Sequence, residues 1–131
     1  MTEREPTDVV TTIRDFVKDD FATRFPELTV DLELPGGWKL GSDPALIVAD
    51  DGDTLKLWPV ATSPTIRVTS WSSGRERKYV NAAIALLLTT RIPGIAAILP
   101  GSGLLDARDP KTRADLSSFT VRTRARLAIP Q

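Results

Sequence analysis

The residues most suited to chemistry form an acidic run, Asp50-Asp51-Gly52-Asp53. A calcium loop needs oxygen ligands at alternating positions and a glutamate about twelve residues along. Leu55, Leu57 and Trp58 occupy that stretch instead. Because aspartate followed by glycine favours the backbone angles of a tight hairpin, we predict a β-turn here. A metal-dependent hydrolase built on these aspartates is the weakest hypothesis, and we expect no metal and no cofactor.

Other reactive groups are scarce. The sequence contains no cysteine and no histidine, which excludes disulfides, thiolate and imidazole catalysis and nearly all zinc sites. Ser102 lies between two glycines but lacks the strand–turn–helix setting and the base that a nucleophilic serine needs. Gly36-Gly37 is not followed by a helix with a lysine at phosphate-binding spacing. We therefore expect a protein that is not an enzyme.

The composition is that of an ordinary soluble domain. The chain has 131 residues, of which 41% are hydrophobic and 26% charged, and this length suits one domain. Residues 1–6 lack the apolar core of a signal peptide, and we expect them to be flexible. The longest apolar run, Val80–Leu88, is about half the length needed to span a bilayer. We expect a single domain over residues 1–131 that does not enter a membrane.

The net charge is zero, but the charges are unevenly distributed. Residues 1–60 hold six lysines and arginines against thirteen aspartates and glutamates, a balance of −7, whereas residues 61–131 hold eleven against four, a balance of +7. Either the two halves interleave in space, or the molecule has one acidic and one basic surface. The second arrangement would suit head-to-tail association of identical subunits.

A row of arginines is the most unusual feature of the chain. From Phe119 onward apolar and polar residues alternate, so that Arg122, Arg124 and Arg126 share one face of a predicted strand with Thr120. Three interpretations are open: a solvated face of an edge strand, a contact with carboxylates of another subunit, or a basic lining that faces nucleic acid. With zero net charge and few aromatic residues nearby, nucleic-acid recognition is the weaker of the two functional interpretations.

Two tryptophans, Trp38 and Trp58, lie in or beside predicted loops. Tryptophan is enriched at protein interfaces, although burial under a loop is at least as common. If both side chains are accessible, they would suit a non-catalytic binding module for a peptide or a small ligand.

The periodicity of the sequence predicts two helices and several strands. The first helix begins at Thr7-Asp8 and ends at Phe25-Pro26; the second covers residues 75–90, with Ser73 and Glu76 as a capping pair. Strands are predicted at residues 28–34, 45–49, 53–58, 64–71 and 104–108 and from residue 119 onward, with turns at 51–52 and 109–113 and an irregular segment over 91–103. This order predicts an α+β domain.

Several stretches carry a resemblance to a known family. They are the strand at residues 64–71 running into Gly74–Ala83, the turn Asp106–Arg113, the last strand Phe119–Arg126, and a short helix before the apolar strand at residues 45–49. Over roughly residues 7–128 the layout resembles the tail terminator proteins of phages with long non-contractile tails, especially those that infect actinobacteria. The segment 50–63 departs from that pattern, since it is richer in acidic residues and proline.

The resemblance implies a small α+β subunit, with two main helices packed on a mixed, mainly antiparallel sheet, that assembles into a hexameric ring. Such a ring caps the tail tube, stops its polymerisation and offers a surface to the head connector. The expected partners are therefore further copies of the chain, the tail tube protein and the head–tail connector, and DNA would only pass through the ring. The expected location is the tail or neck of the virion, after assembly in the bacterial cytoplasm. Other neck, head–tail joining or tail-completion proteins are the alternative within this class.

The charges also predict a subunit contact. If subunits associate through opposite charges, Arg122, Arg124 and Arg126 should meet carboxylates from the acidic half of a neighbour. The most probable carboxylates are Glu27, Asp31 and Glu33, because they lie on or beside a regular strand that holds their side chains in fixed directions.

Overall fold

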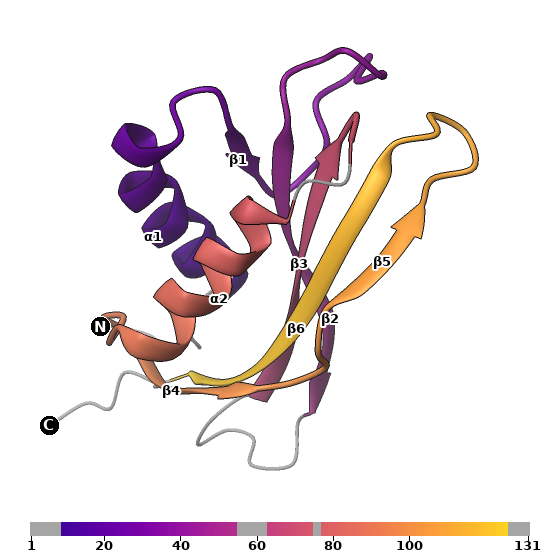
Figure 1. Cartoon of the computed structure of the whole chain (residues 1–131). Helices are drawn as coiled ribbons and strands as arrows, with labels where there is room; N and C mark the ends of the chain where they lie inside the picture. Colours follow the sequence, from indigo (N-terminus) through magenta and orange to yellow (C-terminus); the bar gives the residue numbers. More distant parts are fainter. Residues whose placement is uncertain (1–8, 55–62, 75–76, 126–131) are drawn as a thin grey trace, which may run out of the picture.

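The computed structural model describes residues 9–54, 63–74 and 77–125, which form two helices and six strands (Figure 1). The helices are α1 (Val9–Arg24) and α2 (Lys78–Thr89). The strands are β1 (Thr29–Asp31), β2 (Ala45–Thr54), β3 (Ser63–Ser72), β4 (Ile95–Pro100), β5 (Leu105–Arg108) and β6 (Asp115–Ala125).

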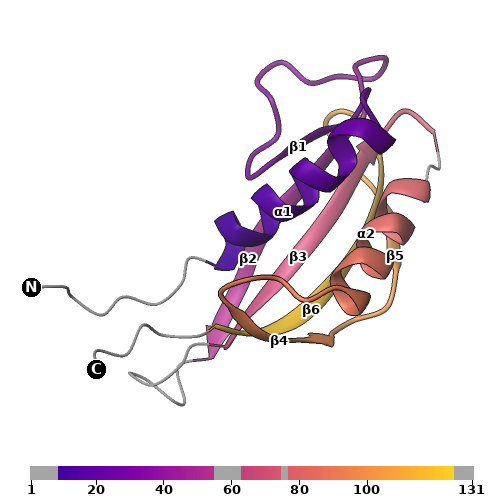
Figure 2. The same ribbon diagram turned by 90° about the vertical axis from the view of Figure 1, so that its left-hand side faces the viewer.

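The six strands form one sheet. Its order is β1-β2-β3-β6, and both β4 and β5 pair with the remaining edge of β6. β1 and β2 are parallel, and every other neighbouring pair is antiparallel. Both helices pack on the same face of the sheet, α1 over β1 and β2 and α2 over β3, β6 and β4 (Figures 1 and 2). The prediction of an α+β fold with a mixed, mainly antiparallel sheet is confirmed.

The main core lies between the helices and the sheet. Apolar residues recur every fourth position along α1 and alternate along β2, β3 and β6, so one stripe of the helix meets one face of the sheet. The buried side chains include Val9, Ile13, Val17 and Phe21 from α1, Leu46 and Val48 from β2, Ile66 and Val68 from β3, Val80, Ala83 and Leu87 from α2, and Phe119 and Val121 from β6. Complete burial of one such large apolar side chain contributes about 1.5–3 kcal/mol. This packing determines which residues of each strand point to the other face.

The acidic run does not form the predicted hairpin turn. β2 continues through it to Thr54, and its ladder with β3 changes register between Asp50 and Gly52, which makes a β-bulge at Asp51. The prediction failed because β2 is already paired with β3 residue by residue, and the bulge accommodates the extra residue without ending the strand. Residues 55–58 of the predicted returning strand lie outside the described part of the chain.

The predicted cap of the second helix is also wrong. α2 begins at Lys78, with Arg77 at the N-cap position and no side-chain hydrogen bond to the helix terminus. The Ser73 hydroxyl instead accepts a hydrogen bond from the Gly41 N–H at 2.8 Å, which ties the loop before β2 to the end of β3. Glu76 lies outside the described residues.

Three strands, β4, β1 and β6, differ from the prediction. Residues 95–100 form a strand rather than an irregular segment, since Gly94 at φ +88° turns the chain and Pro100 ends an edge strand, where its missing N–H is tolerated. β1 is only three residues long, and β6 begins at Asp115 rather than at Phe119. The short strand at residues 105–108 and the turn after it are confirmed, and the Asp109 N–H donates to the Ala114 carbonyl at 2.9 Å across that turn.

The edge formed by β4 and β5 is interrupted at residues 101–104. Here the Gly101 N–H donates to the Thr120 carbonyl at 3.0 Å, and the Ser102 N–H donates to the Thr120 hydroxyl at 2.7 Å. A Cβ atom on Gly101 would lie 2.6 Å from the Thr120 carbonyl oxygen, which is too close for any side chain. A glycine is therefore needed where the backbone lies against Thr120 of β6.

Replacing Gly101 with alanine should destabilise the protein by about 1–3 kcal/mol, because the new methyl group overlaps a backbone atom that β3–β6 pairing holds in place. Urea unfolding would measure the change. Gly103→Ala is the matched control, since nothing lies within 4 Å of its added Cβ, and it should change stability by less than about 0.5 kcal/mol. Equal stability of the two variants would mean that the edge relaxes freely around residue 101.

Candidate interaction surface

One face of the sheet carries no helix among the described residues, and we call it the open face (Figure 1). Side chains alternate along a strand, so residues that neighbour the buried ones point to this face. Cross-strand register places Arg67 opposite Thr120, Thr69 opposite Ser118 and Trp71 opposite Leu116 on it. The parts of this face that no loop covers are available for a partner or for solvent.

Trp38 covers one end of the open face. Its side chain is only 8% exposed and packs with Ala45 and Ala114 in a second, smaller core. The indole Nε1 donates to the Asp43 carbonyl at 2.9 Å, and the ring meets Trp71 edge to face at 5.8 Å between centroids. The structure therefore uses Trp38 for packing within the chain, and Trp58 lies outside the described residues.

Arg67 holds the centre of the open face together. Its Nε and Nη2 donate to the two carboxylate oxygens of Asp51, each at 3.1 Å, and Nη1 donates to the Ser118 hydroxyl at 3.3 Å. The guanidinium therefore links β2, β3 and β6, and hydrogen bonding to it lowers the pKa of the Asp51 carboxyl. The role of this residue was not predicted from the sequence, although an arginine in the middle of a strand with one apolar face was a usable signal.

Arg122 and Arg124 lie on the open face, as the alternation predicts, and both are exposed. Among the described residues no carboxylate lies within ion-pair distance of either. Thr120 was assigned to the same face but is buried, because residues 101–102 cross over it. Arg126 lies outside the described residues.

Two exposed leucines lie on the same face of the sheet as these arginines. Leu99 on β4 stands opposite Arg122 and is 51% exposed, and Leu105 on β5 stands opposite Ser118 and is 54% exposed. Since register partners point to the same face, both leucines belong to the open face. Apolar side chains beside unpaired cations are a composition typical of a surface that contacts another protein.

The carboxylates predicted to meet these arginines have different environments. Glu27 accepts a hydrogen bond from the Tyr79 hydroxyl at 2.5 Å, which lowers the pKa of the Glu27 carboxyl. Asp31 is ion-paired with Arg14 at 3.0 Å. Glu33 is exposed and lies two residues beyond the end of β1. Two of the three are therefore engaged within the chain, and their contact with a neighbour stays a prediction.

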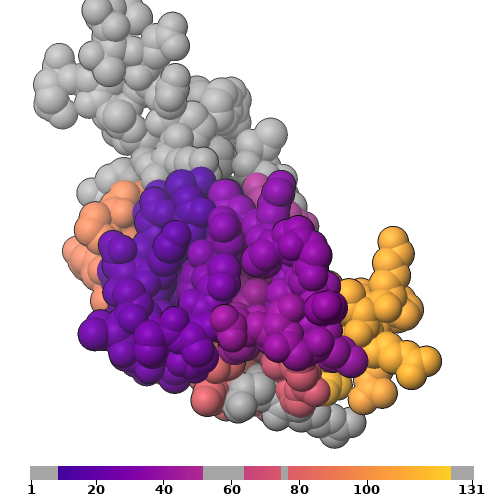
Figure 3. Space-filling model, turned by 90° about the horizontal axis from the view of Figure 1, so that it is seen from above, coloured from indigo at the N-terminus to yellow at the C-terminus, as the bar shows by residue number. Residues whose placement is uncertain are grey.

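The two oppositely charged halves of the sequence occupy different sides of the molecule. Residues 9–54 form α1, β1 and β2 at one side of the sheet and hold ten acidic against four basic residues. The described residues from 63 onward form the remaining strands and α2, and hold three acidic against nine basic residues. Figure 2 shows α1 and β2, in indigo and purple, beside α2 and β5, in salmon and orange, and Figure 3 shows the orange and yellow β5–β6 end projecting beyond the purple segment. The acidic and basic residues are thus separated across the sheet, from the β1–β2 side to the β4–β5 side.

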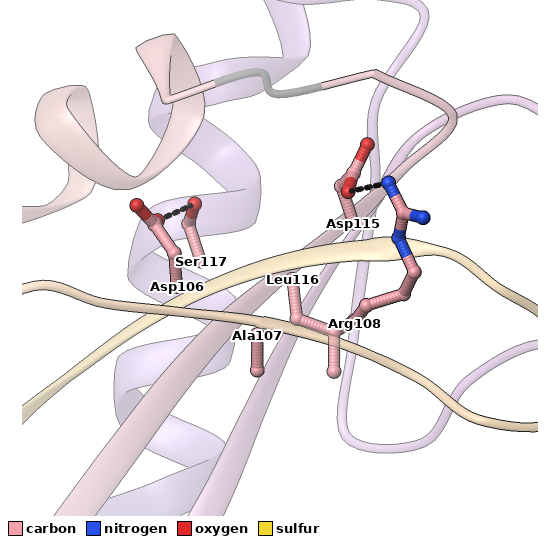
Figure 4. A pocket seen from close by; sticks show the side chains of 6 residues that line it. All are labelled: Asp106, Ala107, Arg108, Asp115, Leu116 and Ser117. Carbon is pink, nitrogen blue, oxygen red and sulfur yellow. Dashed lines mark hydrogen bonds and ion pairs between the residues drawn. The ribbon is translucent and has the colours of Figure 1, made fainter.

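A pocket of about 240 Å³ lies in the β5–β6 hairpin (Figure 4). The Ser117 hydroxyl donates to Asp106 at 2.8 Å, and Arg108 pairs with Asp115 at 3.5 Å. Asp106 also forms an ion pair with Arg77 at the start of α2. These contacts fasten the base of the hairpin to the helix, so the polar groups of the pocket have a structural role.

A metal site and a membrane-spanning helix have requirements that the described residues do not meet. Within residues 9–54, 63–74 and 77–125, no three acidic or other metal-ligating side chains are grouped closely enough to bind a metal ion. In the same part of the chain, neither helix has the length and apolarity to cross a membrane.

Comparison of the sequence with models of known protein families gives no match. Comparison with curated proteins likewise finds none with significant similarity.

The Arg67–Asp51 pair predicts a pH dependence. The pKa of Asp51 is lower in the folded than in the unfolded protein, so its contribution to stability is present at neutral pH and is lost as the pH falls through the folded-state value. Arg67→Met should therefore lower stability at pH 7, and its deficit relative to the unmodified protein should shrink in acid. Urea unfolding at a series of pH values measures both effects.

Arg108→Met is the control for this experiment, because its pair with Asp115 is longer and Arg108 is more exposed. We expect it to have a smaller effect at pH 7. A deficit of Arg67→Met that stays constant down to strongly acidic pH would show that Arg67 acts through packing alone.

Proposed function

We propose that the chain is a structural, non-catalytic subunit of the tail-terminator kind, which caps a phage tail tube as a ring of identical copies. The observation that carries the proposal is the open face, where Arg122, Arg124, Leu99 and Leu105 are exposed without a partner in the described chain. The sequence resemblance described above supports the same function independently. In this function the ring stops polymerisation of the tube and presents a second surface to the head connector.

The lateral separation of charge also supports a ring. A subunit with an acidic side and a basic side is complementary to a copy of itself, and such a head-to-tail contact closes into a ring when its rotation allows. The partners in this proposal are further copies, the tail tube protein and the head connector. The proposed location is the tail or neck of the virion, where DNA would pass through the ring.

The alternative functions receive less support. A neck or head–tail joining protein would need the same kind of open face, and the order of binding to tubes or to DNA-filled heads separates it from a terminator. The hypothesis of a binding module that uses Trp38 has less support, because that side chain is buried and its N–H is hydrogen-bonded within the chain.

The proposal predicts that the purified protein forms rings and that they seat at one end of isolated tail tubes. Negative-stain electron microscopy of the protein with and without tubes tests this directly. Tubes polymerised in its presence should also be shorter, because a cap stops addition of subunits. Binding to DNA-filled heads without binding to tubes would show that the protein joins head and tail rather than terminating the tail. A monomer that binds neither would overturn both functions.

A further inference from the structure

Neither edge of the sheet is suited to pairing with another chain through its backbone. At one edge, β1 has only three residues and pairs with residues 45–47 of β2, and the β-bulge at Asp51 makes the rest of the β2 edge irregular. At the other, the backbone crosses toward Thr120 between β4 and β5, and the Ser102 N–H is already bonded to the Thr120 hydroxyl. Short and interrupted edge strands are devices that oppose strand-to-strand association. Contacts between copies are therefore expected to use side chains.

The side chains available on the basic side form a row along β6 on the open face. We call Leu99, Leu105, Arg122 and Arg124 the basic strip. Register places Leu99 directly beside Arg122 and sets Ala97 beside Arg124. Arg67 lies on the same face but is neutralised by Asp51, so the charge available to a partner is that of the strip.

The opposite side of the molecule carries a complementary group. We call Asp15, Asp19, Asp31 and Glu33 the acidic edge. Arg14 binds both Asp15, at 2.6 Å, and Asp31, at 3.0 Å, which links α1 to β1. Asp19 follows Asp15 by one helical turn and Glu33 follows Asp31 by two residues, so each lies near a carboxylate that binds this arginine. Among the described residues no cation is within ion-pair distance of Asp19 or Glu33.

We propose that the basic strip of one copy binds the acidic edge of the next. This inference rests on one part of the proposed function, namely that copies of the chain associate with one another. It adds which two surfaces make the contact. The argument for a second copy as the partner is charge complementarity, since residues 9–54 carry a balance of −6 and the described residues from 63 onward carry +6. Two copies that met strip to strip would oppose like charges, so the contact is head to tail.

Charge reversal on each surface separately tests the proposal. One variant carries Arg122→Glu with Arg124→Glu, and the other carries Asp19→Lys with Glu33→Lys, which leaves the Arg14 ion pairs intact. Each variant alone should self-associate at least about tenfold more weakly than the unmodified protein, because like charges then face each other. Sedimentation velocity at physiological salt, where the Debye length is about 8 Å, measures this.

The decisive measurement is an equimolar mixture of the two variants. In the mixture every reversed surface finds an oppositely charged one on the other variant, so assemblies should return, with the two variants alternating. Arg91→Glu with Lys111→Glu is the control, because it makes the same change in net charge away from the strip and should assemble normally. Circular dichroism and urea unfolding check that each variant is folded.

A mixture that stays as weakly associated as its components would overturn the proposed contact, and so would a control that loses assembly equally. The result is independent of the function proposed above. Rings that assemble through these surfaces but ignore tail tubes would remove the terminator function and keep the contact. Tubes capped normally by both variants would remove the contact and keep the function.

Discussion

The alternation along β6 is the constraint on which the rest of the structure depends. This strand pairs with β3 on one side and with β4 and β5 on the other, so three other strands are positioned by it. Its apolar residues Phe119 and Val121 must face the helices to be buried, and a shift of one residue would turn them outward. The same requirement sends Arg122 and Arg124 to the open face. The register of β6 with its neighbours thus determines both which of its residues join the core and which of its charges lie on the open face.

Strong periodic patterns were predictable from the sequence, and local irregularities were not. The apolar residues at every fourth position of α1 and the alternation along β3 and β6 predicted the fold class. The alternation along β6 also predicted the face of the sheet to which the arginines point. The Asp51-Gly52 bulge escaped prediction because the same dipeptide favours a hairpin turn, and only pairing with β3 decides between them. The strand β4 escaped because Pro93 and Pro100 argue against regular structure unless the segment lies at a sheet edge. Trp38 could be assigned to packing only once Trp71 was placed beside it.

The charges within the chain divide into those that serve the fold and those that remain available. Arg14, Arg67 and Arg77 each pair with a carboxylate from another element of structure, and together these pairs join α1 to β1, β2 to β3, and α2 to β5. A sum of the charges over each half of the sequence does not separate these two groups. The distinction matters for function, since a cation already held by a neighbouring carboxylate contributes little to the attraction of a partner.

The position of β6 in the sheet also has a consequence for how the chain folds during synthesis. β6 is the last strand of the described sequence, yet it lies in the interior of the sheet, and β4 and β5 pair with no other described strand. After β5 has left the ribosome, the sheet therefore still lacks β6, its interior strand. At that stage α2 can pack on only part of the apolar face that it covers in the complete sheet. Contacts such as Ile66 with Val121 span more than fifty residues, and long-range pairing of this kind slows folding. Until the final strand is made, the nascent chain therefore has one incomplete sheet, formed by β1, β2 and β3, and two segments, β4 and β5, that have no described strand to pair with.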